Sequence, residues 1–578
     1  MRAVRPGPEA VHVDIIKREC KGKVYSYALL RQSYREDGKV KHRTLANLSS
    51  LPPEMVQTMR AALKGQQVGV VGEDWNIERA LPHGHVRAVL GCLRQLGLDR
   101  ALAGEPGRER ELALAMIVSR VLNPCSKLAT SRSWEDSTLA GSLGVEDADE
   151  DDLYEAMDWL LERQPHIEKK LAGKHLKEGG MVLYDLTSTG IEGHRCPLAK
   201  LGYSRDGKRG QAQIEFGLLT NSDGCPVGVE VFKGNVGDPS TVASQVSKIK
   251  DRFGISEVVM VGDRGMLTSA RIEALKEVGS IKWISALRSE HIQSLAASGD
   301  IQLSLFDQRN LVEITSPEFP GERLVVCRNP ALAEERARKR EDLLAATERK
   351  LEKVASAIAS KRSRCRGKDK IGIRVGKVIG RFKMEKHFQI EIGEASLSFE
   401  RDQAGIEAEA ALDGLYVIRT SVSAGELGTE DVVRTYKSLA QVERAFRTLK
   451  SVDLQVRPIR HHLSDRVRAH VFLCMLAYYI RWHMERAWAP LLFRDEDKPI
   501  ANDPVLPARR SQAAMRKVRS QHHPDGTPVH SFRSLLEHLA TLTKNRVRIH
   551  NGITFDKLSE PTPLQERAFA LLRLRPAL

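Results

Sequence analysis

Two short apolar stretches that each run into an aspartate constrain the fold of this chain more than any other feature. Met181–Leu186 contains Asp185, and Glu257–Val261 is followed at once by Gly262 and Asp263. Runs of this length and composition are typical of buried strands. A charged side chain at such a position is expensive unless it is paired or bound to a metal. Both aspartates are therefore candidates for a functional site.

The segments around these stretches predict a mixed sheet. Strand and helix patterns follow one another as β-β-β-α-β-α-β, with strands at 181–186, 212–219, 226–232, 257–261 and 282–287 and helices at 239–253 and 268–278. Three antiparallel strands followed by alternating helices and strands give a mixed sheet with helices. We therefore expect an α/β or α+β fold built on an RNase H-like core, with a mixed five-stranded sheet.

The rest of the chain is expected to surround this core. Its 578 residues exceed the roughly 250–300 residues at which a single core stops growing. A charged helix at Ala331–Arg362 and strand-like runs at 388–392 and 415–419 indicate a large insertion. The expected domains are a β-hairpin region at 1–50, a helical region at 51–178, the first part of the core at 179–289, the insertion at 290–425, a helix and the remainder of the core at 426–492, and a linker with a helical tail at 493–578.

The charge balance limits the kind of partner. Lys and Arg number 90 against 75 Asp and Glu, a formal net charge of +15. This excess favours a polyanion such as nucleic acid, although many soluble proteins are also basic. The N-terminus lacks the apolar run of a signal peptide, and no stretch approaches the roughly 18 apolar residues of a membrane span. We expect a cytoplasmic protein with no membrane partner.

The cysteines and histidines offer no metal-binding pattern along the sequence. None of the 8 cysteines forms a CxxC pair. His83-Gly84-His85 and His194-Arg195-Cys196 have no partner pair at the spacing of a zinc site. We therefore expect no zinc site and a reducing compartment. Phosphate-binding glycine loops are also absent, so no nucleotide cofactor is predicted.

A third carboxylate, Glu443, is predicted to lie on a helix that runs from Thr429 to about Ser451. Glu443 follows Leu439 by four residues and precedes Phe446 by three, so it lies on or beside the apolar face. A glutamate held there either points into a site or pairs with a cation. An ion pair with Arg447, four residues further on, is the alternative.

Three carboxylates at such positions suit one chemistry. Hard oxygen ligands fit Mg²⁺ or Mn²⁺ better than Zn²⁺. Two such ions about 4 Å apart activate an attacking oxygen and stabilise the leaving oxygen of a phosphodiester. We therefore expect Asp185, Asp263 and Glu443 to be both the metal ligands and the catalytic residues.

Four groups of residues form a set of motifs. They are 184–188 with 202–206, 234–238 with Thr241, 261–266, and Tyr436, Glu443, Phe446, Leu449 and Lys450 with 457–459. As a set they resemble the DDE transposases of bacterial insertion sequences, in the IS4-like superfamily whose core is interrupted by a β-strand insertion, and in its IS1634-type branch. The similarity spans about 180–480.

The resemblance implies a DNA transposase that binds terminal inverted repeats, pairs them as a homodimer, and moves the element by cutting and strand transfer into target DNA. The helical region at 51–178 would then bind the DNA ends, and the protein would work at the nucleoid. Tyr436, Lys450, Arg447 and Arg457 are the expected DNA contacts. The family motif carries an arginine where this chain has Leu439, which weakens the transfer of that one contact.

Several alternatives remain open at the level of sequence. The same acids would serve an RNase H-like metal-dependent nuclease without strand transfer, and a repurposed non-catalytic DNA-binding protein could retain them. The basic stretch Lys361–Lys386 either grips phosphates or is a solvated loop. The charged helix Ala331–Arg362 is either a dimer arm or part of an intramolecular helical hairpin.

Overall fold

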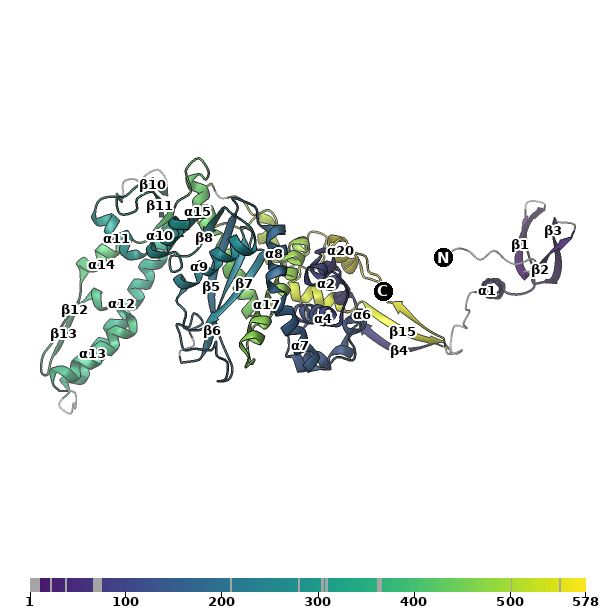
Figure 1. Ribbon diagram of the computed structural model, residues 1–578, viewed down its shortest axis with the longest axis horizontal. Helices are drawn as coiled ribbons and strands as arrows, with labels where there is room; N and C mark the ends of the chain where they lie inside the picture. The colour runs from purple at the N-terminus through teal and green to yellow at the C-terminus, as the bar shows by residue number, and fades with distance from the viewer. Residues whose placement is uncertain are drawn as a thin grey trace. The chain divides into compact units, whose positions relative to one another are not determined.

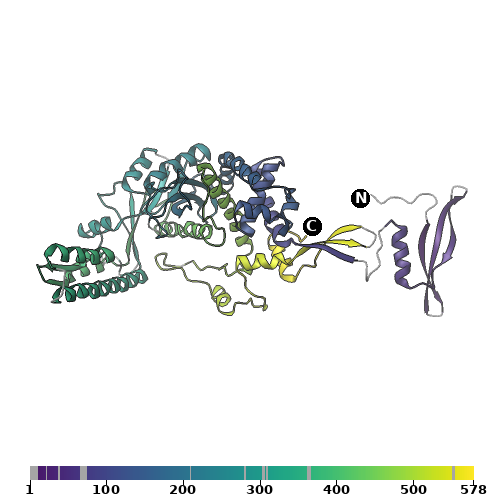
Figure 2. The ribbon, with the colours of Figure 1, turned by 90° about the horizontal axis from the view of Figure 1, so that it is seen from below.

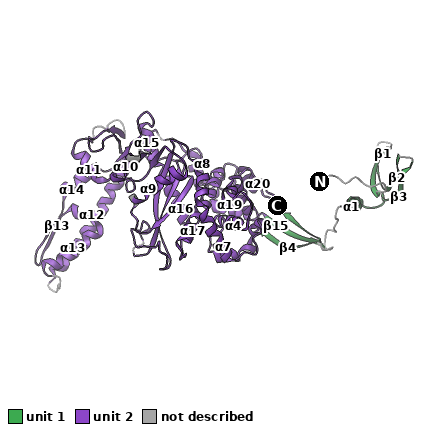
Figure 3. Ribbon diagram, viewed as in Figure 1, with its two compact units in different colours: residues 1–81, 543–559, 578 green, residues 82–542, 560–577 purple. Residues whose placement is uncertain are grey.

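The computed structural model describes most of the chain, namely residues 11–20, 23–36, 39–65, 75–207, 210–278, 281–302, 306, 310–360, 366–500, 502–549 and 553–578. The chain divides into two compact units (Figure 3). Unit 1 comprises residues 1–81, 543–559 and 578, and unit 2 comprises residues 82–542 and 560–577. Among the described residues no helix is both long enough and apolar enough to cross a membrane.

The described residues of unit 1 form two small sheets. The strands β1 (Val11–Cys20), β2 (Lys23–Glu36) and β3 (Lys39–Asn47) form the first sheet, and helix α1 (Pro53–Leu63) packs on β1. The hairpin pattern predicted for residues 1–50 is confirmed in these strands, while its turn at Asp37-Gly38 lies outside the described residues.

The second sheet of unit 1 joins segments from opposite ends of the sequence. It has the order β16-β15-β4, formed by β4 (Trp75–Pro82), β15 (Thr543–Ile549) and β16 (Thr554–Leu558). Helix was expected around β4 and at the C-terminus, and both expectations were wrong for these strands. Their pairing is non-local, and tertiary pairing of this kind overrides local propensity.

The N-terminal part of unit 2 is helical, as the pattern predicted. Helix α7 begins within the acidic stretch at 146–152, and the Asp149 side chain caps it by accepting hydrogen bonds from the backbone N–H groups of Asp151 and Asp152. The helices of this part are α2 (Gly84–Gln95), α3 (Leu98–Leu102), α4 (Arg108–Leu122), α5 (Lys127–Arg132), η1 (Trp134–Asp136), α6 (Leu139–Leu143), α7 (Glu150–Glu162) and α8 (Gln164–His175).

A central mixed sheet forms the middle of unit 2 (Figure 1). Five of its strands, in the order β7-β6-β5-β8-β9, correspond to the predicted RNase H-like core. Strand β5 pairs antiparallel with β6 and parallel with β8, so the sheet is mixed as expected. These strands are β5 (Met181–Gly190), β6 (Gln213–Asn221), β7 (Pro226–Lys233), β8 (Val258–Val261) and β9 (Ile281–Ala286).

The sheet is larger than the sequence predicted, because three strands from the insertion extend it. In the described part of the chain it has eight strands, and β14 (Leu415–Thr420), β11 (Arg323–Arg328) and β10 (Leu311–Ile314) continue it beyond β9. Strand β14 pairs antiparallel with β9. The unpaired backbone groups of an edge strand accept such an addition readily.

The two faces of the sheet are covered by different helices. The core on one face includes Tyr184 and Leu186 of β5 together with side chains of α9 (Asp238–Ser247) and α10 (Ser269–Val278). Successive residues of a strand point to opposite faces, so Asp185 points to the other face. There α16 (Ala440–Lys450) packs on β5, and α17 (Ser464–Ala487) packs on the edge strand β7.

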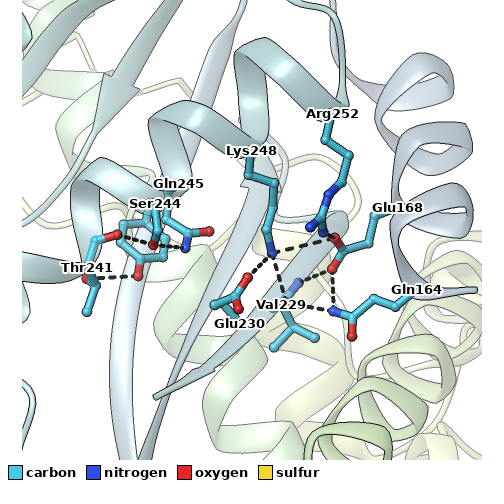
Figure 4. Close-up of polar contacts among 10 residues, drawn as sticks. Gln164, Glu168, Val229, Glu230, Thr241, Ser244, Gln245, Lys248 and Arg252 are labelled. Carbon is cyan, nitrogen blue, oxygen red and sulfur yellow. Dashed lines mark hydrogen bonds and ion pairs between the residues drawn. The ribbon is translucent and has the colours of Figure 1, made fainter. Parts of the chain in front are cut away.

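A buried polar network fixes the edge of this core (Figure 4). The Glu168 carboxylate of α8 is fully buried, accepts a hydrogen bond from the Val229 N–H at 2.9 Å, and pairs with Arg252 at 2.8 Å. Lys248 lies 3.5 Å from Glu168 and 2.6 Å from Glu230. The helix predicted at 239–253 is therefore α9 followed by a wider π-helical turn, η2 (Lys248–Arg252), which carries both cations.

The insertion has its own small core. Leu344, Leu351 and Ile358 on the long helix α12 (Pro330–Ala359) are buried among side chains of α13 (Lys368–Phe382) and of the β12–β13 hairpin. The apolar stripe of α12 is thus used inside the chain, which supports the intramolecular alternative. The remaining elements here are α11 (Ser289–Ala297), η4 (Glu385–His387), β12 (Phe388–Ile392), β13 (Leu397–Arg401) and α14 (Gln403–Ala410).

The basic stretch Lys361–Lys386 is neither a simple loop nor a strand edge. Its first five residues, with Arg364 among them, lie outside the described residues, and the rest is mainly the amphipathic helix α13. Ile371 and Val375 face the core of the insertion, so its cations lie on the opposite side.

The C-terminal part of unit 2 returns to the helical region. The segment 496–530, expected to be a poorly ordered linker, is a long loop that carries a helix, α18 (Figure 2). Ser511 caps α18, and Lys517 holds the loop by bonding Glu496 at 2.6 Å. The elements after α17 are η5 (Ala489–Leu491), α18 (Gln512–Ser520), α19 (Phe532–Ala540) and α20 (Pro563–Leu571).

Candidate active site

The strand register brings the two aspartates side by side. Leu183 of β5 pairs with Val261 of the parallel strand β8. Asp185 follows Leu183 by two positions within β5, and Asp263 follows Val261 by two positions in the loop after β8, so the two aspartates lie beside each other. The prediction that Asp185 stands at the end of its strand was wrong, because β5 continues to Gly190, paired with β6.

The loop after β8 holds Asp263 in place. Its Oδ1 accepts hydrogen bonds from the backbone N–H groups of Gly265 and Met266, both at 2.9 Å. Its backbone carbonyl accepts a hydrogen bond from the Ser285 hydroxyl of β9 at 3.1 Å. These hydrogen bonds fix one carboxylate oxygen of Asp263.

Glu443 lies in the first turn of α16. The single helix expected from Thr429 to Ser451 is in fact two, α15 (Thr429–Lys437) and α16. Between them the backbone bonds of Leu439 and Val442 reach back only three residues, to Tyr436 and Leu439. The turn tightens there because the Ser438 hydroxyl bonds the carbonyl of Thr435 at 2.6 Å.

Helix α16 is held on the sheet by its apolar face. Phe446 packs edge-on against Phe216 of β6, with ring centroids 5.5 Å apart. Phe216 is paired with Thr187 of β5, so α16 covers the face to which Asp185 points. Glu443 itself is exposed at the rim of this face, rather than packed within the apolar stripe.

The three acids influence one another electrostatically. Burial, with the neighbouring Asp263 and to a smaller extent Glu443, raises the pKa of Asp185 to about 7. Burial and the same acids raise the pKa of Tyr436 to about 12, which places the Tyr436 phenol beside them. The charge of Arg205 opposes the rise in the pKa of Asp185, but burial and Asp263 have the larger effect.

The donor set fits divalent metal ions with a preference for oxygen. Asp185, Asp263 and Glu443 offer only carboxylates, which suit Mg²⁺ or Mn²⁺. Sites built from carboxylates can hold two such ions about 4 Å apart. Bound cations would also remove the repulsion that raises the pKa of Asp185.

Cations at the far end of α16 are held against the same strand. Lys450 donates to the Thr187 hydroxyl at 2.6 Å and pairs with Asp206 at 3.1 Å. Arg457 pairs with the other oxygen of Asp206 at 2.6 Å. Burial lowers the pKa of Lys450, and Asp206 opposes that shift.

Of the remaining residues near the site, the sequence analysis singled out Arg447 but not Arg205. Arg447 is exposed, and no ion pair between it and Glu443 is found in the described chain, so that alternative is not supported. Arg205 lies in the motif at 202–206 but was not predicted to have a role of its own. It donates to the Leu186 carbonyl, and its charge lowers the pKa of Asp185.

A cleft of about 480 Å³ opens between the site and the insertion. Tyr436 and Arg264 line it on the side of the core, and Arg336, Lys339 and Lys386 line it on the side of the insertion. Cations outnumber carboxylates by five to two in its lining, and the cleft lies beside the acidic site, an arrangement suited to a phosphate-bearing substrate.

Comparison with known protein families identifies the family of this chain. The Transposase DDE domain matches residues 179–480, more than half of the chain. The N-terminal domain of the IS1634 family transposases matches residues 13–70. The chain therefore belongs to the DDE transposases of insertion sequences, in the IS1634 family.

No curated protein matches the chain. Among solved structures, the synaptic complex of the piggyBac transposase with hairpin DNA is similar to it. That match covers 79% of this chain and 76% of that chain, with 10% sequence identity and a TM-score of 0.33.

Proposed function

We propose that this protein binds the terminal inverted repeats of its element and moves the element by metal-dependent cleavage and strand transfer. The observation that carries the proposal is that Asp185 of β5 lies near Asp263, which directly follows the neighbouring parallel strand β8, with Glu443 on the helix that packs on β5. Hydrolysis of one phosphodiester and attack of the freed 3′-hydroxyl on another need the same arrangement of charge.

Asp185, Asp263 and Glu443 would hold two Mg²⁺ or Mn²⁺ ions, which supply Lewis-acid activation of water and of the leaving oxygen. Asp263 would bind a metal ion through its Oδ2, because the backbone N–H groups of Gly265 and Met266 already hold its Oδ1. Asp185 must lose its proton to bind a cation, and Arg205 assists that loss. Tyr436, protonated at neutral pH, is positioned to donate a hydrogen bond to a phosphate oxygen.

DNA would be bound on both sides of this site. We propose Tyr436, Lys450, Arg447 and Arg457 as contacts to the element's end, with the cationic cleft taking the adjoining phosphates. The helical region at 51–178 is proposed to recognise the inverted repeats, and two copies of the chain to bring the two ends together. Work on chromosomal DNA would place the protein at the nucleoid.

A cleavage assay tests the proposal. The full-length protein would be mixed with Mg²⁺ and a labelled duplex that carries the DNA bordering its own gene. We expect cleavage at the element's end and joining to a second duplex. Asp185→Asn, Asp263→Asn and Glu443→Gln should each lower the rate by at least about 100-fold, since loss of residues that merely support metal ligands already costs about 10–100-fold.

The controls separate the competing functions. Glu430→Gln changes an exposed acid of α15 that pairs with Arg434, and it should cleave at the normal rate. Cleavage of any duplex without joining would favour the nuclease. A shift of the duplex without cleavage by the unmodified protein would favour a non-catalytic DNA-binding protein.

A further inference from the structure

Three residues from distant parts of the sequence meet at the edge of the core sheet, away from the acidic site. His175 ends helix α8, Cys225 precedes β7, and His483 lies in the last third of α17. Their ligand atoms all lie within 4.8 Å of one another. Both helices pack on β7, which Figure 1 shows at the edge of the core strands beside α8.

The spacing of these atoms fits a tetrahedral ion. A thiolate at about 2.3 Å and an imidazole nitrogen at about 2.1 Å from a tetrahedral zinc stand about 3.6 Å apart. The Cys225 Sγ and the His483 Nε2 are 3.9 Å apart. A shift of a few tenths of an ångström would therefore bring both atoms to binding distance.

Neighbouring aromatic residues contact the imidazole rings of His175 and His483. The Tyr479 hydroxyl contacts His175 Nε2 at 2.9 Å and so orients that ring, as oxygen partners of metal-bound histidines do. The rings of Tyr479 and Trp482 flank His483, with centroids 4.7 and 4.8 Å away. Burial lowers the pKa of both histidines, so their imidazoles are neutral and keep a free lone pair.

The neighbouring cations are occupied elsewhere. Arg486 pairs with Asp223 at 3.2 Å and lies over the Trp482 ring. Lys174 donates to the backbone carbonyl of Leu96 at 3.1 Å. Neither charge is therefore aimed at the three ligand atoms, although both oppose a cation by their proximity.

We propose that His175, Cys225 and His483 bind one Zn²⁺ ion, with water as the fourth ligand. A nitrogen and sulfur donor set selects zinc over the hard ions expected at the carboxylates. On binding, the Cys225 thiol loses its proton to solvent and its sulfur bonds the ion, while each imidazole donates a lone pair without losing a proton.

The ion would brace the turn that supports the catalytic helix. Gly224, next to Cys225, has a φ of +82°, and a Cβ there would stand 2.7 Å from the Cβ of Gln441. Gln441 lies in the first turn of α16, two residues before Glu443. Zinc would thus tie α8 and α17 to the turn against which the start of α16 rests.

Cobalt substitution tests the proposal, because a thiolate bound to Co²⁺ gives an intense near-ultraviolet charge-transfer band that carboxylate sites lack. The full-length protein would be purified, its zinc content measured by plasma mass spectrometry, and the metal-free form titrated with Co²⁺. We expect one zinc per chain as purified, and a sulfur-to-cobalt band with tetrahedral visible bands on titration.

Matched variants locate the site. Cys225→Ser should abolish the band, and His483→Gln should weaken Co²⁺ binding by at least about tenfold. Cys474→Ser is the control. The Cys474 Sγ is 3.8 Å from the His470 Nε2, but that nitrogen already contacts the Val456 carbonyl, and the pair belongs to no three-ligand cluster among the described residues. The control should keep both zinc and the band.

Three results would overturn the proposal. They are unmodified protein with neither zinc nor a cobalt–sulfur band, a band that persists in Cys225→Ser, and a band lost equally in Cys474→Ser. Circular dichroism of each variant shows whether it folds. If Cys225→Ser does not fold, the zinc content and the cobalt spectrum of the unmodified protein decide the question by themselves.

Discussion

At the scale of single residues, Asp185 links the chemistry of the site to the stability of the protein. Its pKa rises from the ordinary value of 3.8 to about 7. A raised carboxyl pKa means that the folded state holds the proton more tightly than the unfolded state. The stability penalty is therefore absent below the ordinary pKa, grows as the pH rises towards 7, and stays constant above it.

Asp185→Asn should consequently stabilise the metal-free protein, and by more near pH 8 than near pH 5. Thermal unfolding in a chelator measures this difference. Mg²⁺ should raise the unfolding temperature of the unmodified protein near pH 8 and have a smaller effect on the variant. An unfolding temperature of Asp185→Asn near pH 8 at or below that of the unmodified protein would contradict the repulsion described for the site.

Glu168 makes a second prediction at this scale. It is fully buried and is the partner of Arg252 and of the buried Lys248. Glu168→Ala should lower the free energy of unfolding by about 3–5 kcal/mol, because it removes the carboxylate that pairs with Arg252, the second carboxylate of the buried Lys248 and the acceptor of the Val229 N–H. Urea unfolding measures the change, and the exposed Glu162→Ala on the neighbouring helix should stay within about 0.5 kcal/mol.

The sequence made some of these residues predictable. Asp185 and Asp263 stand out because a charge beside a buried strand needs an explanation, and the order of the strands brings them together. Cys225 gave no such signal, because its neighbours His175 and His483 come from helices far away in the sequence. Only the packing of those helices on β7 reveals the cluster.

At the scale of elements, α16 carries an acid at one end and a cation at the other. Lys450 is held over β5 by Thr187 and Asp206, on the face that bears the acids. Lys450→Ala should weaken binding to the element's end and reduce the salt dependence of binding by about one phosphate contact. Titrations at several salt concentrations measure both quantities.

Lys437→Ala on α15 is the control for this prediction. Lys437 donates to the backbone carbonyls of Val505 and Leu506 at 2.7 and 3.0 Å, so its charge serves the fold. It should leave the salt dependence unchanged. Equal affinity and salt slope for Lys450→Ala and the unmodified protein would remove Lys450 from the DNA contacts.

The helices and strands of the core were largely predictable from periodicity, and the exceptions have physical causes. The apolar spacing from Thr429 to Ser451 continues through Ser438, so periodicity alone cannot detect a turn tightened by a side-chain hydrogen bond. Strands β4 and β15 lie more than 450 residues apart in the sequence. Their pairing depends on the folded chain and leaves no local signal.

At the scale of the whole molecule, the distal part of the insertion leaves the sheet and returns to it at the same place. The Asn329 N–H donates to the Gly414 carbonyl at 2.9 Å, so residues 330–413 leave and re-enter at one point. Replacing them with a short glycine–serine linker should leave the core folded and the oligomeric state unchanged. Circular dichroism and light scattering measure these two properties.

Aggregation of the shortened protein would contradict the prediction that the core folds without residues 330–413. Loss of a dimer would instead favour the interpretation of α12 as a dimer arm. The sequence indicated that an insertion exists but not that its flanking strands join the catalytic sheet. Strands β11 and β14 have ordinary strand patterns, and nothing in them identifies β9 as their neighbour.

The same closure has a consequence for how relatives of this protein are recognised in genomes. A segment that departs and returns at one point of a sheet can lengthen, shrink or be exchanged during evolution without moving Asp263 or Glu443. The interval between the second and third acids is therefore a poor criterion for homology. Searches that score the two aspartate-bearing strands and the glutamate-bearing helix as separate blocks, with free spacing between them, should recover members that a fixed interval would discard.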